Sequence, residues 1–251
     1  KMSASEIVGT EVSCNTVVVY SHAKISNTVT LALPERIFRF CHKDVHIIQK
    51  WTPGGKGGTD IGFGASVYDS SIILSNFIET HTEIVKGKTV LELGCGPGLN
   101  SIVAAIAEAS FVYCTDGDEM SVGLAEENFK SNSGVIPLGT RYATKRLLWN
   151  NEKEMEEAIA ANNESTFNVI IASDITACPY LDGVIALTET ILYLLDSDGV
   201  FYLTYQHRHK SEEMFFDVMR RSFIIHELPR GFIHPDFQSN TSFFIYKITK
   251  K

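Results

Sequence analysis

Hydrophobic and polar positions follow two alternating periods along most of the chain. From residue 65 onward, stretches with apolar residues at helical spacing alternate with short apolar runs that are typical of buried strands. Helices are predicted over residues 65–80, 100–109, 119–131, 152–161, 181–195 and 211–221, and strands over 89–93, 111–115, 140–143, 167–172, 199–205, 224–228 and 242–248. This alternation predicts an α/β fold with a doubly wound, mostly parallel seven-stranded sheet and helices on both faces. The last two strands have no helix between them, which predicts an antiparallel C-terminal edge.

The first sixty residues have a different pattern. β-branched and aromatic residues gather at 11–20, 28–33 and 37–40, between polar turns and Pro34, and predict a small antiparallel β element. The glycine-rich run at 51–58 predicts a flexible connection. We therefore divide the chain into an N-terminal β-rich extension with its glycine-rich connection, residues 1–60, and a main domain, residues 61–251. The extension is our candidate for substrate selection.

Composition narrows the classes of partner. The 251 residues are 44% hydrophobic and 21% charged, which is ordinary globular usage. The 22 Lys and Arg against 30 Asp and Glu give 22 − 30 = −8, a charge that disfavours nonspecific binding to nucleic acid or to anionic membranes. No apolar run approaches the roughly 18 residues of a membrane span. We expect a monomer with neither nucleic-acid nor membrane partners.

The cysteines argue for a reducing compartment. Five are spread along the chain without a CxxC pair, so we expect reduced thiols in a cytoplasmic protein, with the nucleus as a further location. Cys41, His42 and His46 have a passable ligand spacing. A closed zinc site needs about four ligands, and no fourth is evident, so no metal is predicted.

A glycine-rich loop carries the strongest functional signal. The apolar strand 89–93 runs into Gly94, Gly96 and Gly98 and then into a helix, which lets the backbone approach a ligand at the carboxyl end of the strand. The spacing is GxGxG, Pro97 removes one N–H donor, and Glu92 would repel a pyrophosphate. These features favour a cationic ligand that carries an amino group, such as S-adenosylmethionine.

Several stretches together resemble a known family. The run 92–98, Glu-Leu-Gly-Cys-Gly-Pro-Gly, resembles the first motif of the seven-β-strand S-adenosylmethionine-dependent methyltransferases. The segments around it are similar to the non-SET protein lysine methyltransferases, at residues 62–71, 115–116, 128, 147–149 and 172–174. The resemblance covers about residues 60–210. It implies a Rossmann-like methyltransferase sheet, S-adenosylmethionine as the cofactor, and a lysine-containing protein as the substrate.

The resemblance also implies roles for individual residues. Glu92 and the glycine loop would hold the methionine end of the cofactor, Asp116 would accept hydrogen bonds from the ribose hydroxyls, and Trp149 would line the adenine pocket. A solvated loop acid and a core tryptophan are the alternatives for Asp116 and Trp149. The family usually has tryptophan where this chain has Tyr68. The cofactor-binding candidates are Tyr68, Glu92, Gly94, Cys95, Gly96, Gly98, Asp116, Trp149 and Ser173.

Asp174 and Tyr180 are the catalytic candidates. Asp174 follows the strand at 167–172, and a carboxylate there could orient a lysine amine while aromatic faces accommodate its charge. The family usually has an aromatic residue three positions after this acid, where the chain has Ala177. Tyr180 is the candidate to supply that ring from a shifted loop. We interpret the turn 207–209 and the acidic run 152–157 as solvated surface.

Three classes of function remain open from the sequence. The first is a methyltransferase that acts on protein lysine, the reading that the resemblance favours. The second is a small-molecule methyltransferase or an NAD-linked enzyme, because layered α/β folds host many activities. The third is a catalytically silent protein that binds the cofactor or a partner, an alternative that Ala177 keeps open.

Overall fold

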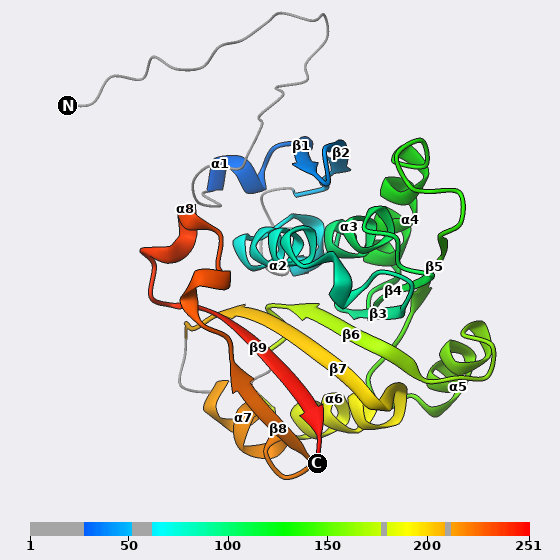
Figure 1. The fold of residues 1–251 in the computed structure, drawn as a ribbon, viewed down its shortest axis with the longest axis vertical. Coiled ribbons are helices and arrows are strands. Elements are labelled where there is room, and N and C mark those ends of the chain that lie inside the picture. The colour runs from blue at the N-terminus through cyan, green and yellow to red at the C-terminus, as the bar shows by residue number, and fades with distance from the viewer. Residues whose placement is uncertain (1–27, 52–61, 177–179, 209–211) are drawn as a thin grey trace, which may run out of the picture.

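The computed structural model describes residues 28–51, 62–176, 180–208 and 212–251. A seven-stranded sheet lies at its centre, in the order β5-β4-β3-β6-β7-β9-β8 (Figure 1). The strands are β3 (Thr89–Leu93), β4 (Phe111–Asp116), β5 (Arg141–Arg146), β6 (Phe167–Ser173), β7 (Leu195–Gln206), β8 (Phe223–Glu227) and β9 (Phe243–Lys250). The first five in this order are parallel, whereas β9 runs antiparallel to β7 and β8. The predicted fold class, with its antiparallel C-terminal edge, is confirmed.

Helices cover both faces of the sheet. One face carries α2 (Asp69–Thr80), α3 (Leu99–Ile106) and α4 (Glu119–Ser131), and the other carries α5 (Glu152–Ala161), α6 (Leu181–Leu194) and α7 (Glu212–Met219) (Figure 1). Short helical turns are η2 (Gly62–Ala65), η3 (Thr82–Ile84), η4 (Arg230–Phe232) and α8 (Pro235–Gln238). Each face has its own buried hydrophobic cluster. In the described part of the chain, no helix is long and apolar enough to cross a membrane.

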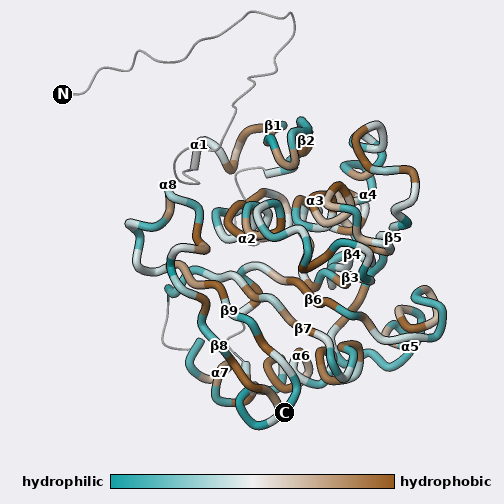
Figure 2. Tube along the Cα trace, in the orientation of Figure 1, coloured by the Kyte–Doolittle hydropathy of each residue, from teal (hydrophilic) through white to brown (hydrophobic). Residues whose placement is uncertain are grey.

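Burial on both faces explains the apolar runs of the central strands. Every residue of β3 after Thr89 is buried, and Val90 lies in register between Val112 of β4 and Val169 of β6. Strands covered on both faces are expected to be continuously hydrophobic. Helix α3 is buried along its whole length, and Figure 2 shows the hydrophobic residues concentrated in this central region. Because β3 runs parallel to β4 and β6, the carboxyl ends of these three strands meet at one edge of the sheet.

An antiparallel hairpin forms a further layer outside the helices. Its strands, β1 (Glu35–Phe40) and β2 (Lys43–Ile48), contact α2 and α4 (Figure 1). Phe38 and Ile47 are fully buried and belong to the same core cluster as α3. Strand β2 was not predicted from the sequence. The turn before it is made by Cys41 and His42, with φ values of 50° and 60°. Such left-handed turns usually carry Gly or Asn, which are absent here.

The strand predicted at 28–33 is wrong, since residues Thr28–Leu31 form the short helix α1. The amide Nε2 of Gln49 donates to the carbonyl oxygens of Thr30 at 3.0 Å and of Leu33 at 2.8 Å. Backbone carbonyls converge on one side chain in a turn, whereas those of a strand alternate in direction. The strand predicted at 11–20 and most of the glycine run at 51–58 lie outside the described residues.

Candidate active site

A cavity of about 680 Å³ opens at the carboxyl ends of the central strands. The glycine loop follows β3, Asp116 ends β4, and Asp174 follows β6, so three neighbouring parallel strands deliver their ends to one place. This is the edge at which open α/β sheets bind ligands. The predicted site residues that line the cavity are Tyr68, Gly94, Cys95, Gly96, Asp116, Trp149, Ser173 and Asp174. Glu92, Gly98 and Tyr180 are not part of its lining.

The glycine loop needs glycine for conformation and for space. Gly94 and Gly96 have φ values of 70° and 50°, in the left-handed region that other residues rarely adopt. A Cβ atom on Gly94 would also lie 2.7 Å from Cγ2 of Ile175. The backbone N–H of Cys95 donates to the carbonyl of Thr115 at 2.9 Å, which ties the loop to β4. The loop thus presents bare backbone to the cavity.

Gly98 has a different task from the other two glycines. It has φ 87° and precedes the first residue of α3. A Cβ atom there would lie 3.1 Å from Cβ of Ala125 on α4, closer than the usual van der Waals contact. Gly98 therefore lets α3 start in the loop and pack closely on α4.

Asp116 joins the loop to the end of β4. Its Oδ2 accepts a hydrogen bond from the Gly96 N–H at 3.0 Å, and its Oδ1 accepts one from the Asp118 N–H at 3.0 Å. Burial raises the pKa of the Asp116 carboxyl, while these hydrogen bonds oppose the change. Each carboxylate oxygen can accept more than one hydrogen bond, so the group can still accept hydroxyl donors.

Glu92 lies behind the loop and is fully buried. It accepts hydrogen bonds from Asn100 Nδ2 at 2.8 Å and from the Ser101 N–H at 2.9 Å, and the Ser101 hydroxyl donates to it as well. Burial raises the pKa of Glu92 to about 7, although these hydrogen bonds lower it. The carboxyl group holds the first turn of α3. Asn100 Nδ2 also reaches Ser173 Oγ at 3.3 Å, which links this buried group to the cavity wall.

Asp174 is held from two sides. Its Oδ1 accepts a hydrogen bond from the Gln206 N–H at 2.9 Å, and its Oδ2 pairs with Arg208 Nη2 at 2.9 Å. The residue has φ 57°, a left-handed conformation that Asp tolerates better than most side chains. Tyr68 lies in the same electrostatic environment: burial raises the pKa of its phenol, Arg208 lowers it, and Asp174 raises it. An acid, a guanidinium and a phenol thus share this part of the cavity.

Tyr180 does not line the cavity. It precedes α6, and 74% of its surface is exposed. Ala177, the position where the family usually has an aromatic residue, lies outside the described residues.

The structure adds residues that the sequence analysis did not select. Arg208, which we had assigned to a surface turn, lines the cavity. A charged side chain just after a central strand was the available signal. Ser121 also lines the cavity, and its buried hydroxyl has no hydrogen-bond partner among the described residues. Phe63 lines the cavity with most of its ring exposed.

The acidic helix α5 exposes Glu152, Glu156 and Glu157, as predicted for a solvated face, but Glu154 differs. Glu154 is only 8% exposed. It accepts hydrogen bonds from Arg146 Nε at 2.9 Å and from the Leu148 N–H at 2.6 Å. One buried carboxylate therefore fixes the turn that leads to Trp149 in the cavity wall.

The lining suits S-adenosylmethionine better than a dinucleotide. Asp116, Asp118 and Asp174 face the cavity, and its guanidinium, Arg208, is already paired with Asp174. A pyrophosphate would meet carboxylates there, whereas a phosphate-free cation with hydroxyl groups finds acceptors. The orphaned Ser121 hydroxyl offers a further polar contact. The sheet order, the glycine loop and the strand-end carboxylate define an S-adenosylmethionine-dependent methyltransferase.

Comparison with known proteins places the chain within this class. The lysine methyltransferase family matches residues 55–222, more than half of the chain, and the chain belongs to that family. Protein N-lysine methyltransferase METTL21A of Danio rerio is 30% identical over 76% of this chain and 79% of that protein. METTL21A of Xenopus tropicalis is 29% identical over 75% of this chain and 78% of that protein. The calmodulin-lysine N-methyltransferase of Arabidopsis thaliana is 36% identical over 43% of this chain and 34% of that protein.

Solved structures support the fold. A 16S rRNA N2 G1207 methyltransferase of T. thermophilus, in complex with AdoMet and guanosine, has a TM-score of 0.57 at 15% identity, and the match covers 86% of this chain and 50% of that one. The methyltransferase SMU.776, complexed with SAH, has a TM-score of 0.54 at 14% identity over 88% of this chain and 57% of that one. At such identities the likeness concerns the fold.

Proposed function

We propose that the protein methylates a lysine side chain of a protein substrate, with the cofactor beside the glycine loop and the lysine beside Asp174. The observation that carries this proposal is that the glycine loop, Asp116 and the Asp174–Arg208 pair line one cavity. A methyl donor and an acceptor amine bound in the same cavity can react by proximity and orientation alone.

The cofactor side supplies binding and orientation. S-adenosylmethionine brings a methyl group on a positively charged sulfur. In our proposal Asp116 accepts the ribose hydroxyls, the bare backbone of Gly94 and Gly96 permits close approach, and the ring of Trp149 stacks with the adenine. Glu92 acts from behind the loop, where it holds α3 and, through Asn100, Ser173.

On the acceptor side, the substrate ammonium replaces the guanidinium of Arg208 as the partner of Asp174. Arg208 occupies Oδ2 of Asp174, while the Gln206 N–H holds Oδ1. A substrate ammonium that displaces Arg208 would meet a carboxylate whose orientation is already fixed. Tyr68 stays an un-ionised phenol because burial raises its pKa, and its ring can face the incoming cation. After the ammonium has released one proton to solvent water, Asp174 Oδ2 orients the neutral amine.

The proposal is tested by incubating the purified protein with a cell lysate and S-adenosylmethionine carrying a labelled methyl group. A labelled protein band, with the label mapped to lysine by mass spectrometry, supports it. A labelled metabolite without a labelled band would instead identify a small-molecule methyltransferase. Cofactor binding without any label would identify a silent binding protein. Heat-inactivated protein gives the background of the lysate enzymes.

We further propose a monomer in the cytoplasm, with the nucleus as a further location, and no nucleic-acid partner. Cys95 and Cys114 are free and buried, and burial together with the hydrogen bond to Cys114 raises the pKa of the Cys95 thiol. A buried thiol whose pKa is raised stays protonated and unreactive, so we expect Cys95 to remain a free thiol. Light scattering of the purified protein tests the oligomeric state, and microscopy of a tagged copy tests the location.

A further inference from the structure

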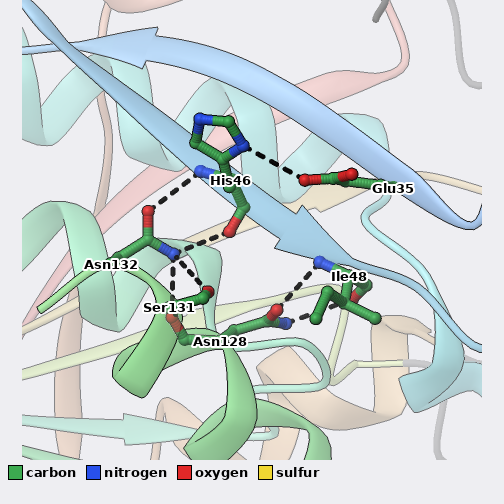
Figure 3. A network of polar contacts seen from close by, with 6 residues as sticks. All are labelled: Glu35, His46, Ile48, Asn128, Ser131 and Asn132. Atoms are coloured by element: carbon green, nitrogen blue, oxygen red, sulfur yellow. Dashed lines mark hydrogen bonds and ion pairs between the residues drawn. The ribbon is translucent and has the colours of Figure 1, made fainter. Parts of the chain in front are cut away.

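Two asparagines on one helix face complete the edge of the N-terminal hairpin. Asn128 of α4 and Asn132, the residue that caps the C-terminus of the helix, lie one turn apart and point at β2 (Figure 3). Asn132 accepts a hydrogen bond from the His46 N–H at 2.9 Å and donates to the His46 carbonyl at 2.6 Å. Asn128 likewise accepts a hydrogen bond from the Ile48 N–H at 2.8 Å and donates one to the Ile48 carbonyl at 3.1 Å. The side chains replace a neighbouring strand and satisfy the polar edge of β2.

Asn128 alone extends this contact to the cofactor loop. Its Nδ2 also donates to the carbonyl of Pro97 at 2.8 Å, so both amide protons are used within the protein. Asn128 is fully buried, and Pro97 belongs to the glycine loop and lines the cavity. One side chain therefore joins the hairpin, α4 and the cofactor loop.

The hairpin also holds a second part of the cavity wall. Gln49, which follows β2, accepts a hydrogen bond from the Val67 N–H at 2.9 Å. Arg36 of β1 donates to the Val67 carbonyl at 3.0 Å, and the Lys50 N–H donates to the Ala65 carbonyl at 2.9 Å. Val67 and its neighbour Tyr68 line the cavity. Two walls of the cavity thus depend on the same hairpin.

We infer that hairpin β1–β2 is part of the cofactor-binding unit, with Asn128 as the positioning residue that fixes the glycine loop. The inference rests on the proposed function, in which the cavity binds S-adenosylmethionine. It gives the N-terminal element a task other than substrate selection. A boundary at residue 60 would separate the hairpin from the loop that it supports.

The test compares Asn128→Ala with Asn132→Ala, a matched control that loses the equivalent pair of bonds to β2 but no bond to the loop. We expect both variants to unfold at lower temperature. Only Asn128→Ala should raise the calorimetric Kd for S-adenosylmethionine, about tenfold, or about 1.4 kcal/mol. Hydrogen exchange of the backbone amides of Gly94, Cys95, Gly96 and Gly98 should accelerate in Asn128→Ala and stay unchanged in Asn132→Ala.

Equal effects of the two variants on Kd and on loop exchange would overturn the inference, as would unchanged loop exchange in Asn128→Ala. If that variant does not fold, Asn128→Asp is compared with Asn132→Asp. Each keeps an acceptor for an N–H of β2 and loses its donor to β2, and only the first also loses the bond to Pro97. Hydrogen exchange is measured on the free protein. Failure of the unaltered protein to bind the cofactor would therefore count against the proposed function, while loop exchange still decides the inference.

Discussion

The two sides of the cavity are built in different ways. The cofactor side consists of strand ends and loop backbone, tied together by Asp116 and by the buried Glu92 behind the loop. The acceptor side consists of side chains around the ion pair of Asp174 and Arg208, whose guanidinium side chain is 46% exposed. A partly exposed pair contributes about 0–1 kcal/mol and can change partners. In the proposed function, this contrast assigns the cofactor to backbone held by buried carboxyl groups and the substrate amine to an ion pair that can exchange partners.

The largest effect should come from Asp174→Asn, which keeps the shape and the left-handed backbone but removes the charge. We expect methyl transfer at saturating cofactor to fall about a hundredfold to a thousandfold, as for the loss of an orienting charged group. The Kd for S-adenosylmethionine should change little, since this substitution alters only the acceptor side. Asp182→Asn, on the exposed first turn of α6, is the control. Lost cofactor affinity with retained single-turnover transfer would contradict this division.

Glu92→Gln tests the buried carboxyl group on the cofactor side through the pH dependence of the free energy of unfolding. The pKa of Glu92 is about 7 in the folded protein against an ordinary 4.5, so the folded state binds the proton more tightly. The Glu92 contribution to stability is therefore full below about pH 4.5 and is lost as the pH rises toward 7, amounting to roughly 3 kcal/mol.

Urea unfolding at several pH values measures this contribution. Between about pH 5 and pH 7, stability should fall less in Glu92→Gln than in the unaltered protein, by the Glu92 contribution. Glu156→Gln, which changes an exposed acid on α5, should keep it. Parallel pH profiles for the unaltered protein and Glu92→Gln would mean that Glu92 is ionised in the folded protein throughout this range.

Asp116→Asn tests the cofactor side directly. Hydrogen bonds to a charged acceptor are worth roughly 1.5–3 kcal/mol, so we expect the Kd for S-adenosylmethionine to rise about thirtyfold. The rate at saturating cofactor should stay close to that of the unaltered protein. Calorimetry measures the first quantity and steady-state kinetics the second. Glu119→Gln, an exposed charge change at the start of α4, controls for the altered net charge. A lower rate at saturating cofactor with an unchanged Kd would place Asp116 on the acceptor side.

The smallest effect is expected for Arg208→Gln, which removes the cation that competes for Asp174. The KM for the protein substrate should fall about threefold, because the competing pair is weak. The Kd for the cofactor should not change. Arg220→Gln, an exposed arginine of a surface pair, is the control. A rise in KM would show that Arg208 helps to bind the substrate.

Elements with local signals were predicted well. The boundaries of β3, α4 and α5 agree with those predicted, and Asp118 and Asn151 cap the two helices through the N–H groups of Ser121 and Glu154. The strand predicted at 28–33 was wrong and β2 was missed. In both places the backbone is satisfied by distant amide side chains, which no local period reveals.

The sequence by itself determined the mostly parallel α/β fold with its antiparallel edge, the glycine loop and the carboxylate at the end of β4. These features depend on periodicity and on the left-handed conformations of glycine, which are encoded by neighbouring residues. Only the tertiary structure decided the pairing of Asp174 with Arg208, 34 positions apart, and the attachment of the hairpin at Ile48 to Asn128, 80 positions apart. Such contacts form between side chains that the fold brings together.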